Sequence, residues 1–296
     1  MGKTTRAMAF IYCGIVYLIA FAAGYAAFLI FQKTGVLTAT FLADIAATIV
    51  VWFFGLLLHN ASLYDPYWSV APLIILPAWL AVRGMPLRTA DILFMIAIYV
   101  WGVRLTCNWA YRWRGLSHQD WRYTMIREKN PRMYFLANLM GINIMPTVLV
   151  FMGLAPVYYA LMGGGQAGIW TYLGFILCIG AALLQAVADR QMEDFQKSSA
   201  KRSDHIDTGL WRLSRHPNYL GEIFFWWGIW LMQMGVVPFW PTAIGPIAIT
   251  LLFVCVSIPM MERHIQATRP GYKNYKNEVP MLVPTRRTPA HDENSR

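Results

Sequence analysis

The charged residues of this chain are gathered into short stretches that separate long apolar blocks. An α-helix rises about 1.5 Å per residue, so about 20 apolar residues cross the hydrocarbon core of a bilayer. Eight blocks reach or approach that length: residues 8–31, 41–58, 68–82, 89–108, 142–162, 168–188, 219–236 and 243–261. The pattern predicts an all-α fold, a polytopic membrane helical bundle with seven or eight transmembrane helices.

Two of these blocks are ambiguous. The third is short and contains Pro72 and Pro77, so we expect it to be broken, tilted or partly re-entrant. Lys3 and Arg6 precede the first block, a pattern that is also typical of a signal peptide. Its apolar stretch is too long for a signal peptide and seven more blocks follow, so we interpret it as the first helix.

Composition and charge agree with this interpretation. Hydrophobic residues make up 57% of the 296 residues and charged residues only 14%, against about 25% in soluble domains. With eight spans, 21 of the 25 Lys and Arg residues fall on one side of the membrane. The positive-inside rule then predicts that both termini are cytoplasmic. The net charge of +10 reflects this asymmetry and an attraction to anionic headgroups, so no nucleic-acid partner is expected.

The organisation along the chain is simple. We expect one integral membrane domain over 1–284, with N-terminal helices at about 8–108 and a C-terminal half at about 109–284. The polar tail over 285–296 is expected to be disordered. The four cysteines are scattered and the histidines have no metal-ligand spacing, so inert thiols and no metal site are expected. No obligate protein partner is evident.

The strongest candidate for chemistry is the segment from Gly209 to Glu222, which contains Arg215, His216 and Pro217. Pro217 fits the first turn of a helix that begins at the membrane border. The free N–H groups of that turn, with Arg215 and His216 beside them, predict an anion or phosphate site.

Polar residues also continue into the helix that follows. Asn218, Glu222 and Trp226 recur every four residues and therefore share one face. A carboxylate one turn inside the membrane costs ~2.5 kcal/mol or more unless it is paired. A functional role for Glu222 is favoured over a role in helix packing.

Other polar groups lie at the ends of the apolar blocks. Asp189 and Glu262 follow the sixth and the last block, and Asp65 precedes the third among aromatic residues. Asp65 is either a proton donor or a helix cap ahead of Pro66. Tyr99, in the fourth block, is a polar group that can face an interior cavity.

Three stretches together resemble the membrane steroid 5α-reductase family, in the bacterial branch long labelled a domain of unknown function. They are residues 189–222 with Arg-His-Pro-Asn-Tyr-x-Gly-Glu, the segment Asp65-Pro66-Tyr67-Trp68, and residues 272–284. The similarity covers most of the chain, and the first stretch also resembles the sterol Δ14 and Δ7 reductases. The resemblance implies a seven-helix core, bound NADPH and a location in a bacterial inner membrane.

The resemblance also implies roles for individual residues. It matches Asp189, Asn218 and Glu222 to cofactor positions of the family. With Arg215, His216, Tyr219 and Tyr272, these are the candidate cofactor-binding residues. Asp65 and Tyr99 are the candidate catalytic residues that hydrogen-bond the 3-keto group of a steroid, although another register places Trp101 at the tyrosine position. The chain departs from the family where Asp65 replaces a glutamate and where Glu193 and Gln196 replace arginines. Phosphate contacts then fall to Lys197, Lys201, Arg202 or Arg215.

Three functions follow from these features. The first is NADPH-dependent reduction of a C=C bond conjugated to a ketone in a lipophilic, steroid-like substrate, of the 3-oxo-5α-steroid 4-dehydrogenase type. The alternative is an S-adenosylmethionine-dependent methyltransferase of the isoprenylcysteine carboxyl methyltransferase type, a class that shares Arg-His-Pro-x-Tyr. Those enzymes usually lack an acid at the position of Glu222 and carry paired glutamates where this chain has Glu262-Arg263. A non-enzymatic lipid-binding or scaffold protein is the third, and it predicts no nucleotide binding.

Overall fold

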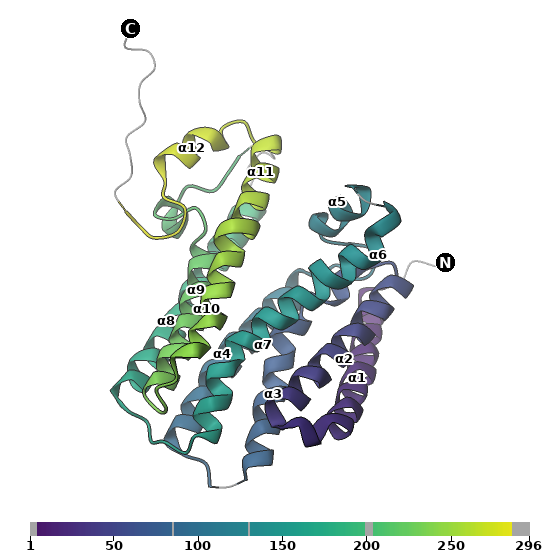
Figure 1. Cartoon of the computed structure of the whole chain (residues 1–296). Coiled ribbons are helices and arrows are strands. Elements are labelled where there is room, and N and C mark those ends of the chain that lie inside the picture. The colour runs from purple at the N-terminus through teal and green to yellow at the C-terminus, as the bar shows by residue number, and fades with distance from the viewer. Residues whose placement is uncertain (1–4, 85, 130, 199–203, 286–296) are drawn as a thin grey trace. The chain divides into compact units, whose positions relative to one another are not determined.

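The chain is an integral, multi-pass membrane protein made of helices. A computed structural model describes residues 5–84, 86–129, 131–198 and 204–285, and no strand occurs among them. Seven helices in this part of the chain are long and apolar enough to cross a membrane, which confirms the predicted helical bundle. Most of the predicted tail over 285–296 lies outside the described residues. The chain divides into two compact units between Gln166 and Ala167, and each is described by itself (Figure 1).

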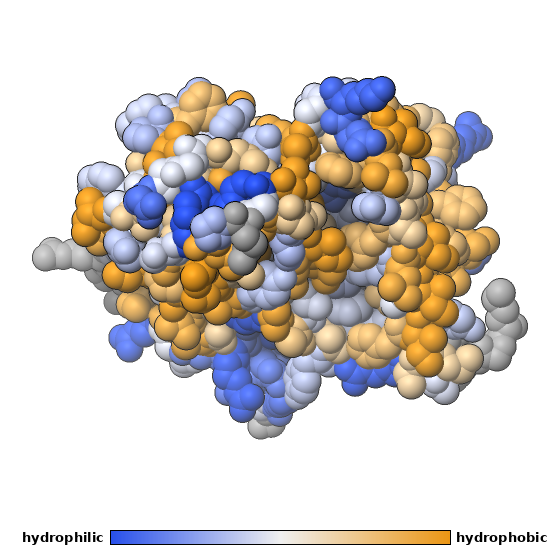
Figure 2. All heavy atoms as spheres, turned by 90° about the horizontal axis from the view of Figure 1, so that it is seen from below, coloured by the Kyte–Doolittle hydropathy of each residue, from blue (hydrophilic) through white to orange (hydrophobic). Residues whose placement is uncertain are grey.

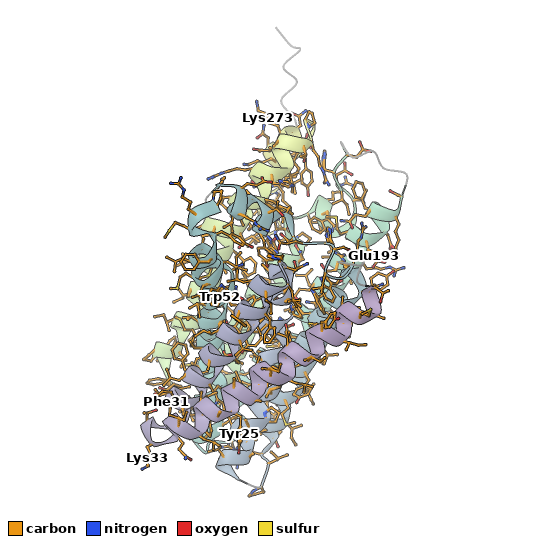
Figure 3. All side chains as sticks on the ribbon, turned by 90° about the vertical axis from the view of Figure 1, so that its right-hand side faces the viewer. Tyr25, Phe31, Lys33, Trp52, Glu193 and Lys273 are labelled. Atoms are coloured by element: carbon orange, nitrogen blue, oxygen red, sulfur yellow. The ribbon has the colours of Figure 1, made fainter. Side chains whose placement is uncertain are left out.

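The described part of unit 1 contains seven α-helices and one π-helix. They are α1 (Arg6–Phe31), α2 (Val36–Leu57), α3 (Tyr67–Arg83), α4 (Thr89–Arg112), α5 (Trp121–Lys129), α6 (Tyr134–Ala137), η4 (Asn138–Ile144, the π-helix) and α7 (Met145–Met162). α1 and α2 form a hairpin whose turn lies at Phe31 and Lys33 (Figure 3). Gly35 closes this turn with φ of 100°, a conformation that favours glycine.

The third apolar block forms one continuous helix rather than a broken one. α3 runs for 17 residues with Pro72 and Pro77 inside it. Proline has no backbone N–H, so Pro77 leaves the carbonyl of Leu73 without its usual helical donor. The hydroxyl of Tyr99, from α4, donates to that carbonyl at 2.9 Å. Neighbouring helices satisfy broken backbone bonds in this way within membranes, which explains why α3 stays intact.

The turn between α3 and α4 is held by one buried carboxylate. Asp91 is fully buried and pairs with Arg83 at 2.7 Å and with Arg88 at 2.9 Å. Arg88 also donates to the carbonyls of Ala160 and Leu161 at the end of α7. Arg83 and Arg88, two of the few basic residues predicted on the far side of the membrane, therefore form ion pairs and hydrogen bonds inside the protein.

Among its described residues, unit 2 contains five α-helices and a second π-helix. They are α8 (Ile169–Lys197), α9 (Pro217–Met234), α10 (Ile244–Leu251), η7 (Leu252–Ser257, the π-helix), α11 (Ile258–Thr268) and α12 (Tyr272–Glu278). α9 forms where the seventh block predicted it, but with 18 residues that include Glu222 it is not among the seven apolar spans. α12 crosses the end of this unit beside α11, with Lys273 at its tip (Figures 1 and 3).

Apolar side chains also cover much of the outer surface. α1 exposes Ile11, Leu18, Tyr25 and Ile30, each more than half exposed. Figure 2 shows broad apolar areas interrupted by hydrophilic patches. Such surface is unfavourable in water and is what hydrocarbon chains contact in a membrane.

Helices α8 and α9 approach each other through glycines. A Cβ atom on Gly174 would lie 2.6 Å from the carbonyl oxygen of Gly228, and one on Gly228 would lie 2.6 Å from Sγ of Cys178. Small residues at such a contact let two backbones pack closely, which is a main source of helix association in membranes. The glycines therefore set the spacing of the two helices that carry Asp189, Asn218 and Glu222.

We expect Gly174→Ala to lower the free energy of unfolding by about 1–3 kcal/mol, because the new methyl group meets the backbone of α9. Gly180→Ala is the matched control on the same helix, since nothing lies within 4 Å of its Cβ position. That control is expected to change stability by less than about 1 kcal/mol. Thermal unfolding of both variants in detergent checks the difference, and equal melting temperatures would contradict the close α8–α9 contact.

Candidate functional site

The start of α9 takes the form that its sequence predicts. Pro217 occupies the first turn, and His216 is the N-cap residue without a side-chain cap bond. The hydroxyl of Ser214 accepts from the backbone N–H of His216 at 3.2 Å. All three residues are buried, so this helix start lies inside unit 2 and not on its surface.

Glu262 of α11 is the centre of a buried ionic cluster at this helix start. Its Oε1 accepts from Nε of Arg215 at 2.7 Å and lies 3.1 Å from Nε2 of His216. Its Oε2 pairs with Nζ of Lys276, from α12, at 3.0 Å. The structure thus brings together two of the acidic and basic helix ends that the sequence singled out.

Arg215 ties the C-terminal segment to α9. Its Nη1 donates to the carbonyls of Lys276 and Val279, each at 2.6 Å, and its backbone N–H donates to the carbonyl of Pro280 at 3.0 Å. Its side chain is only 9% exposed. These contacts use most of its hydrogen-bonding capacity within the protein, so Arg215 serves as a structural anchor.

His216 and Tyr272 are uncharged members of the same cluster. Burial lowers the pKa of His216 below its ordinary value, although the hydrogen bond to Glu262 acts in the opposite direction. Burial likewise raises the pKa of the Tyr272 phenol. His216 therefore adds no positive charge near neutral pH, which weakens the anion site that the sequence predicts here.

The remaining cofactor candidates lie on α9 and α8. Glu222 is 5% exposed and accepts from Nε1 of Trp226 at 2.9 Å, in line with their shared face. The ring of Tyr219 stacks on His216 with a centroid distance of 5.4 Å. Oδ1 of Asn218 is buried and has no hydrogen-bond partner within the described part of the chain.

Asp189 lies in the part of α8 that is hydrogen-bonded to Leu210 and Trp211, in the segment before α9. Nε1 of Trp211 donates to the carbonyl of Ala188 at 3.1 Å, and Gln191 accepts from the backbone N–H of Leu210 at 2.9 Å. Asp189 is partly buried between these two attachment points. Of the proposed phosphate ligands, Lys197 pairs with Glu193, whereas Lys201 and Arg202 lie outside the described residues.

In unit 1 the structure pairs Asp65 with Tyr123. The hydroxyl of Tyr123, in α5, donates to Oδ1 of Asp65. Two connections hold the segments that carry them: Nδ2 of Asn60 donates to the carbonyl of Leu116 at 2.9 Å, and the N–H of Asp120 donates to Ser62 Oγ at 3.1 Å. Burial raises the pKa of the Tyr123 phenol, so Tyr123 is a neutral hydrogen-bond donor.

Tyr99, the sequence candidate for this partnership, makes a different contact. Its hydroxyl is engaged with the carbonyl of Leu73, as described above, and its side chain is 37% exposed. Trp101, from the other register, is fully buried and packs edge-on against Trp68. Tyr99 therefore bonds the backbone of α3, whereas Tyr123 is the tyrosine that bonds Asp65.

Sequence reasoning also missed a buried polar network inside unit 1. The hydroxyl of Tyr67 donates to Oδ1 of Asp44 at 2.7 Å. Thr147 of α7 shares hydrogen bonds with Thr48 at 2.9 Å and with Tyr64 at 2.8 Å. The signal for Asp44 was available, because it is the single carboxylate in an otherwise apolar block.

Comparison with known proteins identifies relatives but no three-dimensional counterpart. The profile of a family described as "protein of unknown function (DUF1295)" matches residues 51–279. An uncharacterized protein of Schizosaccharomyces pombe is 26% identical over 210 residues, which cover 62% of this chain and 60% of the relative. Methanethiol S-methyltransferase 1 of Bradyrhizobium diazoefficiens is 35% identical over 80 residues, 27% of this chain and 26% of that protein. No solved structure matches the chain.

We expect Glu262→Gln to destabilise the protein by about 3–5 kcal/mol, because it leaves the buried guanidinium of Arg215 without its counter-charge. Glu193→Gln is the control, since it removes only one partner of the pair with Lys197, whose side chain is 57% exposed. That loss is worth about 1 kcal/mol at most. Denaturant unfolding gives the stabilities, and equal effects of the two substitutions would contradict the central role of Glu262.

Proposed function

The chain belongs to the DUF1295 family, and we propose that it is an NADPH-dependent reductase of a C=C bond conjugated to a ketone in a lipophilic, steroid-like substrate. The observation that carries this proposal is the pair of Asp65 and Tyr123. A neutral phenol beside a carboxyl group can turn its single proton from that group to a carbonyl oxygen as negative charge develops there.

The residues of unit 1 then act on the substrate as follows. NADPH held by the protein would supply the hydride that adds to the β-carbon of the enone. Tyr123 donates its single phenolic proton to Asp65, and the proposal requires this proton to turn to the carbonyl oxygen of the substrate. As the π electrons move onto that oxygen, Tyr123 gives it this proton, and the protonated carboxyl group of Asp65 passes its own proton to the phenolic oxygen. The enol returns to the ketone when the α-carbon takes up a proton, so the sum is addition of one hydride and one proton.

The residues of unit 2 fit a nucleotide cofactor. Oδ1 of Asn218 is a buried acceptor that lacks a donor in the described part of the chain. The carboxamide and ribose groups of NADPH carry such donors. Glu222 is a second buried acceptor on the same helix, one turn further on. Asp189, Asn218 and Glu222 are therefore the residues that we expect to hold the cofactor, with Tyr219 beside them.

The proposal includes a location. The excess of basic residues on one side supports an orientation with both termini in the cytoplasm, where NADPH is available. A bacterial inner membrane is proposed from the family resemblance. A substrate that partitions into the bilayer reaches a membrane-embedded protein directly.

A methyltransferase that uses S-adenosylmethionine is the second candidate function. It is favoured by the similarity to methanethiol S-methyltransferase 1 over 80 residues. The ribose and ammonium groups of S-adenosylmethionine also carry donors that suit Asn218. The acid at Glu222, which the methyltransferases usually lack, favours the reductase.

We expect NADPH to raise the melting temperature of the detergent-purified protein and S-adenosylmethionine to leave it unchanged. A cofactor at 100 times its dissociation constant stabilises a protein by about 2.7 kcal/mol, which such a measurement resolves. Glu222→Gln should reduce the shift, while Arg190→Gln, at an exposed pair with Asp194, should preserve it. Stabilisation by the methyl donor alone would replace the reductase with the methyltransferase.

We expect Tyr123→Phe and Asp65→Asn to lower the reduction rate of a conjugated steroid enone by about 10²–10⁴-fold and to spare NADPH binding. Tyr99→Phe is the matched control, because it removes a hydroxyl that bonds only the backbone of α3 in the contacts seen here. It should cost about 1 kcal/mol of stability and leave turnover near that of the wild type. Loss of turnover in Tyr99→Phe together with retained turnover in Tyr123→Phe would reverse the assignment.

A further inference from the structure

A π-helix interrupts the long helical span at residues 131–162 of unit 1. η4 covers Asn138–Ile144, seven residues in which backbone hydrogen bonds join positions five apart. Residues five apart therefore fall on one face, whereas in an α-helix they are turned away from each other by about 140°. The π-helix thus places Asn138 and Asn143 on one face, and both are buried. π-helices are rare in proteins, and those that occur often lie at functional sites.

The orientation of the Asn143 side chain is fixed by its neighbour. Nδ2 of Asn143 donates to both oxygens of Asn138, the backbone carbonyl at 2.9 Å and Oδ1 at 2.7 Å. Both atoms are acceptors, so the amide nitrogen of Asn143 must be the group that faces them. Its amide oxygen is turned away from Asn138.

That oxygen has no hydrogen-bond partner. Asn143 is 1% exposed, and Oδ1 finds no donor among residues 5–84, 86–129, 131–198 and 204–285. A buried carbonyl oxygen without a donor is unfavourable and uncommon in native proteins. In a membrane-spanning segment the surrounding hydrocarbon supplies no donor either.

The residues adjacent to Asn143 connect it to the groups already described. Ile142 packs against Ala61 and Tyr123 in one apolar cluster. Thr147, one helical turn further along the chain, is bonded to Thr48 and Tyr64. Asn143 therefore lies in the chain between Ile142, which contacts Tyr123, the proposed catalytic tyrosine, and Thr147, which is bonded to Tyr64.

We propose that Oδ1 of Asn143 accepts a hydrogen bond from a hydroxyl group of a lipophilic alcohol, and that this alcohol is the substrate. Oδ1 of Asn143 can only accept, so its ligand must carry a hydrogen-bond donor. The apolar surroundings favour a neutral donor such as a hydroxyl over an ammonium ion. The assignment rests on the proposed function only in calling the alcohol the substrate. It adds a second polar contact, a hydroxyl, to the ketone that the proposed function already requires.

The test uses a photoreactive diazirine derivative of octanol and its methyl ether as matched probes. The two are nearly equal in apolar surface, but only the alcohol can donate a hydrogen bond. Labelling of the full-length protein in detergent, followed by mass spectrometry of the peptide that contains residues 138–147, measures which probe reaches Asn143. No NADPH and no turnover are needed, so the result is independent of whether the protein proves to be a reductase.

We expect the alcohol to label this peptide of the wild type about tenfold more than the ether, the worth of one buried hydrogen bond. Asn143→Leu should abolish the preference, and Thr40→Val should retain it, because that control removes a buried hydroxyl of the same unit that bonds Val36 and Trp79 instead. Equal labelling by the two probes in the wild type would overturn the proposal without any variant. A preference that survives in Asn143→Leu would also overturn it.

Discussion

Hydrocarbon offers no hydrogen bonds, so the polar groups inside this chain depend on the chain itself for partners. That constraint explains contacts that are distant in sequence. Tyr99 supplies the bond that Pro77 cannot give, and Asp91 pairs with two arginines at the turn that joins the same helices. In unit 2 the carboxylate of Glu262 likewise contacts three side chains, those of Arg215, His216 and Lys276. The architecture is thus held by a few buried polar contacts within a largely apolar packing.

The same constraint makes the unsatisfied groups informative. Oδ1 of Asn218 and Oδ1 of Asn143 are buried acceptors with no donor in the described part of either unit. One lies beside Glu222 on α9, and the other lies in the π-helix near Tyr123. Because satisfied polar groups are the rule, these two acceptors carry the proposed contacts with a cofactor and with an alcohol.

The helical spans were predictable because about 20 apolar residues leave few alternatives to a membrane helix, and seven of the eight blocks have counterparts among the apolar spans. Local signals also located the start of α9 at Pro217. The partner of Asp65 was not predictable, since 58 residues separate it from Tyr123 and the contact depends on how α5 is attached. The π-helix was equally hidden, because hydropathy does not distinguish a turn with one extra residue.

The anchor formed by Arg215 has a consequence for how the motif around it is interpreted. Its guanidinium and backbone fasten residues 276–280 to the start of α9, with His216 engaged on the same carboxylate. By resemblance, Arg-His-Pro-x-Tyr is found in both reductases and methyltransferases, which transfer different groups from different donors. The contacts of Arg215 give this motif a structural task that does not depend on either chemistry. In both candidate functions, the choice of cofactor then falls to residues outside this anchor.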